Sequence, residues 1–259
     1  MTQELQTLYS ELINRMKQGV EMHEQLADYY NFLNLPGYAK CHEYQMLCEL
    51  LTYRKAKDMY MREYNQLVQP AYMVNNTLTN MAANSNNPNA MNNMANNKMN
   101  YSSNVIPTNW YNYTRYDVDQ GTKRTAVKEG FKKWLDYEKD TKQYLTNMAQ
   151  YLEQNNEREA ARKLDYLIEH VEKEIEAAEN KMMNLESAGY DMNYILQQQE
   201  ELKQHYAEKI RKMNDKNSQF RRRGEGNYSN YNFHDYEDDD DEESDFNYAR
   251  GRRIRYGRY

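Results

Sequence analysis

The chain has 259 residues, of which 39% are hydrophobic and 29% are charged, and its formal net charge is -6. An acidic balance of this kind gives no global basic field that would attract nucleic acid. No stretch approaches the roughly 20 apolar residues that span a bilayer, and the N-terminus lacks the basic and apolar blocks of a signal peptide. We therefore expect a cytoplasmic protein without a membrane-bound part.

The composition favours long helices. There are only 9 glycines and 4 prolines, whereas tyrosine reaches 26 residues against 5 phenylalanines. Much of the apolar filling must therefore come from rings whose hydroxyl groups need partners. Cys41 and Cys48 are seven positions apart on one expected helix, about 10 Å along its axis, which is too far for a disulfide. We interpret them as buried thiols of a reducing compartment.

Residues 3–66 predict a helical hairpin. The first helix, from Gln3 to about Leu33, is expected from side chains that recur at spacings of three and four: Leu5, Leu8, Leu12, Met16, Val20, His23, Ala27 and Tyr30. The turn is Asn34-Leu35-Pro36-Gly37, where proline suits the first turn of a new helix. The second helix continues to about Gln66, with a ragged apolar pattern and an unusually polar inner face.

The composition changes after the hairpin. Residues 70–108 contain 13 asparagines, 5 methionines and no acid, which predicts a flexible, low-complexity crossover. Residues 109–119 are rich in tyrosine, and we expect them to pack on the helices as an ordered strap, with plain disorder as the alternative. At the other end of the chain, residues 216–259 alternate basic, acidic and Arg/Tyr blocks, which predicts a solvated tail.

A second hairpin is expected between the strap and residue 190. A third helix, from Thr122 to Gln154, places Glu138 and Thr141 at positions where its pattern otherwise has apolar residues. Asn156 and Glu159 have the spacing of a capping box for a fourth helix, which should end near Gly189. A fifth helix is expected over residues 191–215, with a weaker apolar pattern, and it could pack on the bundle or on a second chain.

Residue numbering places four glutamates at similar heights. If the first hairpin is antiparallel about a centre near residue 35.5, Glu21 lies level with residue 50, beside Glu49. About a centre near residue 155 in the second hairpin, Glu138 lies level with Glu172. The four helices would then each present one carboxylate to a common interior level.

Several short motifs resemble bacterial ferritins. They are Gly19-Val20-Glu21-Met22-His23 on the first helix, the Leu35-Pro36-Gly37 turn with Glu49 after it, Tyr137-Glu138 on the third helix, and the run from Tyr166 to Glu172 on the fourth. This resemblance covers residues 5–68 and 120–187. It implies an all-α, ferritin-like up-down four-helix bundle with a long crossover, and metal ligation by Glu21, Glu49, Glu138 and Glu172, with Glu169, His170 and His42 as secondary candidates.

One departure from the resemblance weakens the implied chemistry. A ferritin-like dinuclear site needs a histidine three residues after the second-helix glutamate, and Thr52 stands in that place. No Glu-x-x-His occurs anywhere in the chain. Four carboxylates at one level cannot all stay ionised without help. They would bind a hard cation such as iron or manganese, or be protonated or paired with basic groups, or lie on the surface because the helices are rotated.

These observations favour a ferritin-like bundle with a degenerate metal centre, acting as a non-catalytic binding or assembly protein. One alternative is an iron- or manganese-binding relative, for storage or oxidation, with a carboxylate-only site. Another is a structural component of a spore coat, phage or other assembly. We expect self-association or another protein as partner. The Arg/Tyr block of the tail has the chemistry to contact nucleic acid, and it could equally be an intramolecular counter-charge for the acidic run; we do not expect nucleic acid as a partner.

Overall fold

The structure is a computed structural model that describes residues 3–69, 74 and 118–222. The elements in this part of the chain are all helices: α1 (Gln3–Phe32), α2 (Pro36–Tyr64), α5 (Gln120–Gln154), α6 (Arg158–Ser187) and α7 (Met192–Arg222). The expected all-α class is therefore confirmed. The crossover insert apart from Val74, the strap up to residue 117 and the tail from residue 223 lie outside the described residues. Helix α7 extends through residues 216–222, whereas the sequence pattern predicts that the tail begins at residue 216.

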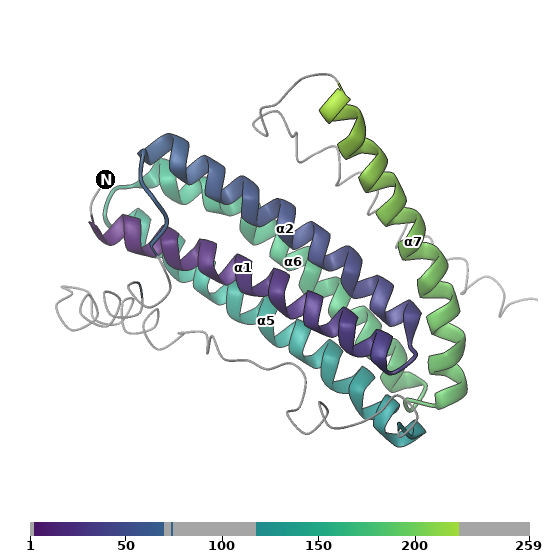
Figure 1. Cartoon of the computed structure of the whole chain (residues 1–259). Helices are drawn as coiled ribbons and strands as arrows, with labels where there is room; N and C mark the ends of the chain where they lie inside the picture. The colour runs from purple at the N-terminus through teal and green to yellow at the C-terminus, as the bar shows by residue number, and fades with distance from the viewer. Residues whose placement is uncertain (1–2, 70–73, 75–117, 223–259) are drawn as a thin grey trace, which may run out of the picture. The chain divides into compact units, whose positions relative to one another are not determined.

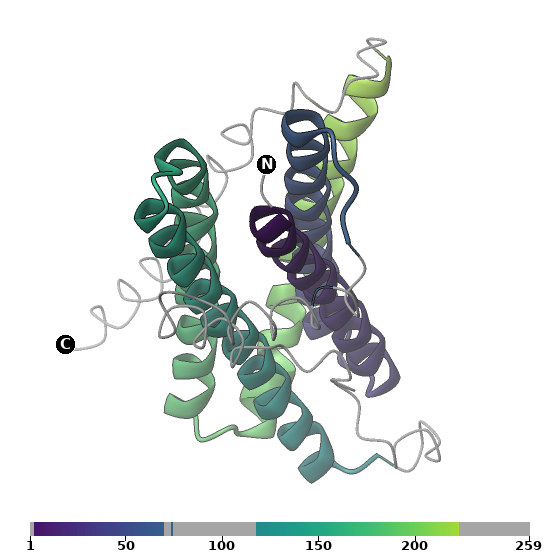
Figure 2. The same ribbon diagram turned by 90° about the vertical axis from the view of Figure 1, so that its left-hand side faces the viewer.

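The helices up to Asn214 belong to one compact unit, to which the following description refers. Helices α1 and α2 form one antiparallel hairpin, and α5 and α6 form a second (Figure 1). The hairpins lie side by side with α1 against α5, and Figure 2 shows the two pairs next to each other in a second view. Within the described residues, no helix is long and apolar enough to cross a membrane.

Three turns end their helices with the same backbone motif. Asn34, Asn156 and Gly189 each have a positive φ, of 59°, 62° and 60°. In each turn the residue after the positive φ donates its N–H to a carbonyl five residues earlier, at 2.8–2.9 Å, as in a Schellman motif. Glycine and asparagine suit this left-handed backbone because they tolerate it best. The expected end of the fourth helix near Gly189 is confirmed.

The same motif corrects the expected capping box. Asn156 ends α5, and Glu157 is the residue that precedes the first turn of α6, with no side-chain cap. A side-chain cap is found instead at the start of α5, where Asp119 accepts a hydrogen bond from the N–H of Thr122 at 2.6 Å. Asparagine serves both kinds of helix end, so its position in the sequence did not distinguish between them.

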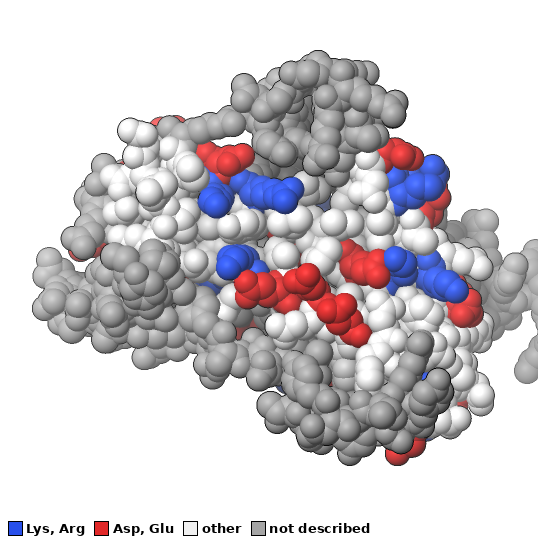
Figure 3. Space-filling model, viewed as in Figure 1, with Lys and Arg blue, Asp and Glu red and all other residues white. Residues whose placement is uncertain are grey.

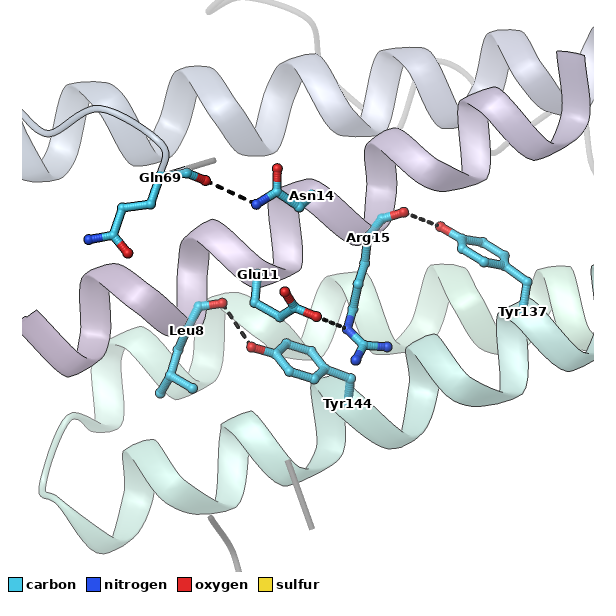
Figure 4. A network of polar contacts seen from close by, with 7 residues as sticks. All are labelled: Leu8, Glu11, Asn14, Arg15, Gln69, Tyr137 and Tyr144. Atoms are coloured by element: carbon cyan, nitrogen blue, oxygen red, sulfur yellow. Dashed lines mark hydrogen bonds and ion pairs between the residues drawn. The ribbon is translucent and has the colours of Figure 1, made fainter. Parts of the chain in front are cut away.

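Tyrosine hydroxyls connect α1 to α5. Tyr30 on α1 donates to the carbonyl of Ala126 on α5 at 3.2 Å, and Tyr137 on α5 donates to the backbone carbonyl of Arg15 on α1 at 3.1 Å. Tyr144 donates to the carbonyl of Leu8 at 2.9 Å (Figure 4). Each ring fills space between the hairpins while its hydroxyl bonds a helix carbonyl. The chain's tyrosine content therefore supplies apolar packing without leaving these three hydroxyls unsatisfied.

A buried ion pair lies in the same seam. The guanidinium of Arg15 contacts the carboxylate of Glu11 at 3.0 Å, and both side chains are fully buried. The Arg15 guanidinium carbon also lies 4.4 Å from the centre of the Tyr144 ring, in a cation–π contact (Figure 4). Close by, Asn14 donates to the carbonyl of Gln69, which holds the chain after α2 against α1.

The apolar core consists of two clusters. One contains α1 residues from Leu5 to Met16 together with α5 residues from Tyr144 to Leu152 and α6 residues from Ala160 to Val171. The other contains Met22 and later residues of α1, the first part of α2, Ala126 to Tyr137 of α5, and parts of α6 and α7. Between these clusters, the buried side chains are mostly polar, and this polar layer contains the candidate site.

Helix α7 packs on the N-terminal part of α2. The rings of Tyr44 and Tyr206 are 5.4 Å apart, and the ammonium of Lys209 lies 5.3 Å from the Tyr44 ring centre. At Gly37 the two backbones approach so closely that an added Cβ would lie 2.5 Å from the carbonyl carbon of Gln199. Glycine is therefore required where α7 crosses the start of α2.

Candidate metal centre

Buried polar side chains occupy the middle of the bundle. Helices α1, α2 and α5 supply them: His23, His42, Gln45, Glu49, Thr52, Glu138 and Thr141, all less than 9% exposed. On α2 these residues recur every three or four positions, so the inward face of α2 is polar from His42 to Thr52. The unusually polar inner face expected for the second helix is thus present.

The most deeply buried acid is Glu138, which is 1% exposed. The indole N–H of Trp134 is the one side-chain donor near this carboxylate among the described residues, and it lowers the pKa of Glu138 without forming a well-aligned hydrogen bond. Burial raises the pKa of Glu138 well above its usual range, and the charges of Glu49 and Glu174 raise it further. Burial at this position therefore favours the neutral carboxylic acid form of Glu138.

Glu49 is the second buried acid, at 8% exposure. Burial, and then the charge of Glu174, raise its pKa to about 8. Because Glu49 also raises the pKa of Glu138, the two groups titrate as an interacting pair. The structure therefore brings together two of the four glutamates that the sequence analysis singled out.

A third carboxylate at this level was missed from the sequence. Glu174 is half-buried on α6 and accepts a hydrogen bond from the side-chain amide of Gln45 at 2.9 Å, which bridges α6 and α2. It lies two positions after Glu172, about 200° away around the helix. The apolar pattern of α6, with Val171 and Ala178 buried, was the signal that indicates this inward face.

The other two glutamates lie at the surface. Glu21 is half exposed and pairs with Lys17 on the same helix at 3.2 Å. Glu172 is also half exposed and pairs with Lys142 of α5 at 2.8 Å. Their helices direct both side chains away from the core. Of the secondary candidates, Glu169 is exposed and His170 is half-buried.

Thr52 does not act as a substitute ligand in this structure. Its hydroxyl donates to the carbonyl of Cys48 on the preceding turn at 3.2 Å. This bond is the local back-bonding that threonine makes inside helices. The hydroxyl of Thr141, by contrast, is buried without a hydrogen-bond partner among the described residues.

Next to the carboxylates lies a buried histidine pair. Nδ1 of His23 is 2.8 Å from Nδ1 of His42, and the two rings stack with centres 5.1 Å apart. Trp134, Phe131 and Tyr30 surround them, each with its ring centre 5.4–5.7 Å from that of His42. Burial lowers the pKa of His23 to about 3 and that of His42 well below its usual range. His42, a secondary metal candidate, thus has its Nδ1 engaged by His23.

Comparisons with known proteins give a fold. No protein-family profile and no curated protein sequence matches the chain. Two solved structures do: an open-pore ferritin from the hyperthermophilic archaeon Archaeoglobus fulgidus, and a closed form of that ferritin engineered by site-directed mutagenesis. Each match has a TM-score of 0.55 and 14% identity, and covers 78% of this chain and 96% of the other. The chain therefore has a ferritin-like fold.

Proteins with a ferritin-like fold often bind iron at a group of carboxylate and histidine ligands. Within the part of the chain that the structure describes, no three histidine, cysteine, aspartate or glutamate side chains are grouped so that they could hold a metal ion. The carboxylate of Glu21 lies on the surface of the bundle, and residue 52 is a threonine, which has no imidazole to act as a ligand. The residues present do not fit a pair of iron ions.

Proposed function

We propose that this chain is a ferritin-like helical bundle that acts as a non-catalytic binding or assembly protein, with a degenerate metal centre. The observation that carries this proposal is the division of the four glutamates. Glu49 and Glu138 lie in the core, while Glu21 and Glu172 make ion pairs at the surface. A dinuclear centre needs ligands from all four helices at one level, so this arrangement supports binding or assembly over turnover.

The test is aerobic addition of ferrous iron to the purified protein, followed by metal analysis. We expect no iron oxidation above a protein-free control and no stoichiometric retention of metal. Glu172→Ala is the matched control, because it removes an exposed carboxylate of α6. Stoichiometric oxidation that is lost in Glu49→Ala but kept in Glu172→Ala would overturn the proposal.

A second candidate function is cation binding without turnover, at an oxygen-only site. It is favoured by Glu138, whose buried carboxylate makes no well-aligned hydrogen bond among the described residues and interacts with the charge of Glu49. Carboxylate oxygens suit hard cations such as manganese(II). A bound cation would stabilise the folded protein by mass action. In this case manganese(II) should raise Tm, the Glu138→Gln variant should lose that increase, and Glu172→Gln should keep it.

A further inference from the structure

The two hairpins approach each other closely on one side and less closely on the other. Backbone contact between them is made mainly by α1 and α5. On the opposite side, which we call the α2–α6 seam, the side chains of Gln45 and Glu174 form a hydrogen bond at 2.9 Å. Glu174 is half-buried, and its charge raises the pKa of the buried Glu49 and Glu138. The α2–α6 seam therefore lies between these two carboxylates and the surface.

Tyr206 of α7 fills this seam from outside. It is 1% exposed, and its ring centre lies 5.4 Å from that of Tyr44 on α2 and 5.7 Å from the ammonium of Lys181 on α6. The same ammonium lies 5.8 Å from the ring centre of Trp134, which adjoins Glu138 in the polar layer. A tyrosine of α7 thus contacts both hairpins, and Lys181 and Trp134 connect it to the polar layer.

Helix α7 is held on the bundle by one stripe of side chains. The buried residues recur at spacings that place them on one face: Met192, Ile195, Tyr206, Lys209 and Met213. The outer face is charged. Glu208 and Arg211 pair there at 2.7 Å, and acidic and basic side chains adjoin each other over the face of the molecule drawn in Figure 3. A helix attached by a single stripe opens at a lower free energy than the helices that form the core.

The surface of α2 beneath α7 contains a thiol. Gly37, Cys41 and Tyr44 are spaced by four and three residues, so they form one line along α2. Gly37 lies against the backbone of Gln199, and Tyr44 lies against Tyr206. Cys41, between these two contacts, is fully buried and is not in a disulfide. The reactivity of Cys41 can therefore report whether α7 is in place.

We propose that the α2–α6 seam is the route by which solvent and small ions reach Glu49 and Glu138, and that α7 is a lid on this route. With α7 in place, Tyr206 fills the seam. When α7 lifts about the turn at Gly189, the seam opens while α1 and α5 hold the two hairpins together. The inference goes beyond the proposed function, because it concerns access to the two carboxylates and holds whether or not they bind a cation.

The first measurement is the rate at which iodoacetamide labels Cys41 in the full-length Cys48→Ser protein, which has one thiol left. We expect Tyr206→Ala to raise this rate at least about tenfold, because it removes the ring that holds α7 to both hairpins. Leu196→Ala is the matched control. It shortens a side chain of α7 that is 39% exposed, and it should change the rate by less than about twofold.

The second measurement follows the route inward. Trp134 is fully buried, and it is the single tryptophan left in the Trp110→Phe protein. Acrylamide, a small uncharged quencher, should quench its fluorescence at least about threefold more efficiently after Tyr206→Ala, and Leu196→Ala should again have little effect. Hydrogen exchange in Gln120–Gln154 should stay within about twofold of the original rate, because the core helices remain folded.

A measurement without a change in α7 covers the case in which Tyr206→Ala does not fold. In the Cys48→Ser protein, the labelling rate of Cys41 should rise with urea less steeply than global unfolding does, since a local opening exposes less surface. Equal steepness would overturn the inference, because Cys41 would then be exposed by unfolding of the whole bundle.

Three results with Tyr206→Ala would also overturn the inference. If labelling and quenching are both unchanged, α7 is not a lid. If labelling rises and quenching does not, α7 leaves without opening a route to Trp134. If both rise and exchange in α5 accelerates equally, the whole bundle opens. Metal takes part in none of these measurements, so failure of the lid and failure of the non-catalytic proposal can be told apart.

Discussion

The ring of Tyr137 lies where a side chain at Gly19 would begin. A Cβ on Gly19 would be 2.7 Å from the ring carbon that carries the Tyr137 hydroxyl, and closer still to the hydroxyl oxygen. The ring is held there by its hydrogen bond to the Arg15 carbonyl. At this height the inward-facing residue of α1 is therefore a glycine, which a tyrosine of α5 covers. Glu21 lies about 200° away from Gly19 around the axis of α1.

Gly19→Ala should destabilise the protein, although alanine is normally the better helix former. The helical preference favours alanine by about 0.5–1 kcal/mol, but overpacking against a fixed ring costs about 1–3 kcal/mol. We expect a net loss of about 1–2 kcal/mol in urea unfolding. In the Tyr137→Phe background this loss should shrink, since the closest atom is gone. Gly121→Ala, near the exposed start of α5, is the control.

The histidine pair predicts a tautomer signature. A hydrogen bond between the two Nδ1 atoms requires that one ring carries its proton on Nδ1 and that the other accepts there. Nitrogen NMR should therefore show one Nδ1–H and one Nε2–H imidazole. Since burial lowers the pKa of His23 to about 3, its ring should stay neutral down to about pH 4. Two identical tautomers, or titration near pH 6.5, would contradict the paired geometry.

Glu49 gives the stability a dependence on pH. Its pKa is about 8 in the folded protein and 4.5 as the unperturbed value. The folded state therefore binds more protons than the unfolded state between these values, so the free energy of unfolding falls as pH rises, by up to about 1.4 kcal/mol per unit. His23 and His42, whose pKa values are lowered, have the opposite effect below their usual pKa of 6.5. Since each histidine is still half protonated in the unfolded chain at pH 6.5, the contribution of Glu49 is measured as the difference in slope between the original protein and a variant that lacks this carboxylate.

Glu49→Gln should reduce this slope, because the amide does not titrate. Urea unfolding at pH 6.5 and pH 8 measures it, and Glu172→Gln serves as a control that removes an exposed carboxylate. Some slope should remain in Glu49→Gln, since Glu138 also has a raised pKa. Equal slopes in the original protein and in Glu49→Gln would show that Glu49 is ionised in the folded state.

The sequence predicted the helices and the height of the site better than its ligands. Spacing and turn residues indicate helix bounds within a few residues, because apolar periodicity and positive-φ residues act locally. Counting from a turn also predicts that Glu49 and Glu138 lie at similar heights, and in the structure the charge of Glu49 acts on Glu138. Counting does not give the rotation of a helix about its own axis, however. Each helix turns its apolar residues to the core, and this rotation directs Glu21 and Glu172 outward. Glu174 was missed for the same reason.

The sequence did not predict which polar side chains contact each other between helices. The contact between His23 and His42 depends on side-chain packing between two helices. The contact between Tyr137 and Gly19 depends on packing between segments more than a hundred residues apart in the sequence. Local patterns do not carry such information. The motif resemblance gave the fold, which the match to solved ferritin structures supports, whereas the arrangement of carboxylates had to be read from the packing of the helices.

The contact between Gly37 and Gln199 determines whether α7 can pack on α2. A Cβ at position 37 would lie 2.5 Å from the carbonyl carbon of Gln199 and 2.6 Å from its Cα, and backbone atoms cannot move aside as a side chain tip does. Gly37→Ala should therefore displace α7 while the hairpin of α1 and α2 persists, because position 37 lies in the first turn of α2 and alanine is well tolerated there. Hydrogen exchange should speed up in Met192–Arg222 far more than in Gln120–Gln154. Uniform acceleration across the helices would show instead that α7 unfolds together with the bundle.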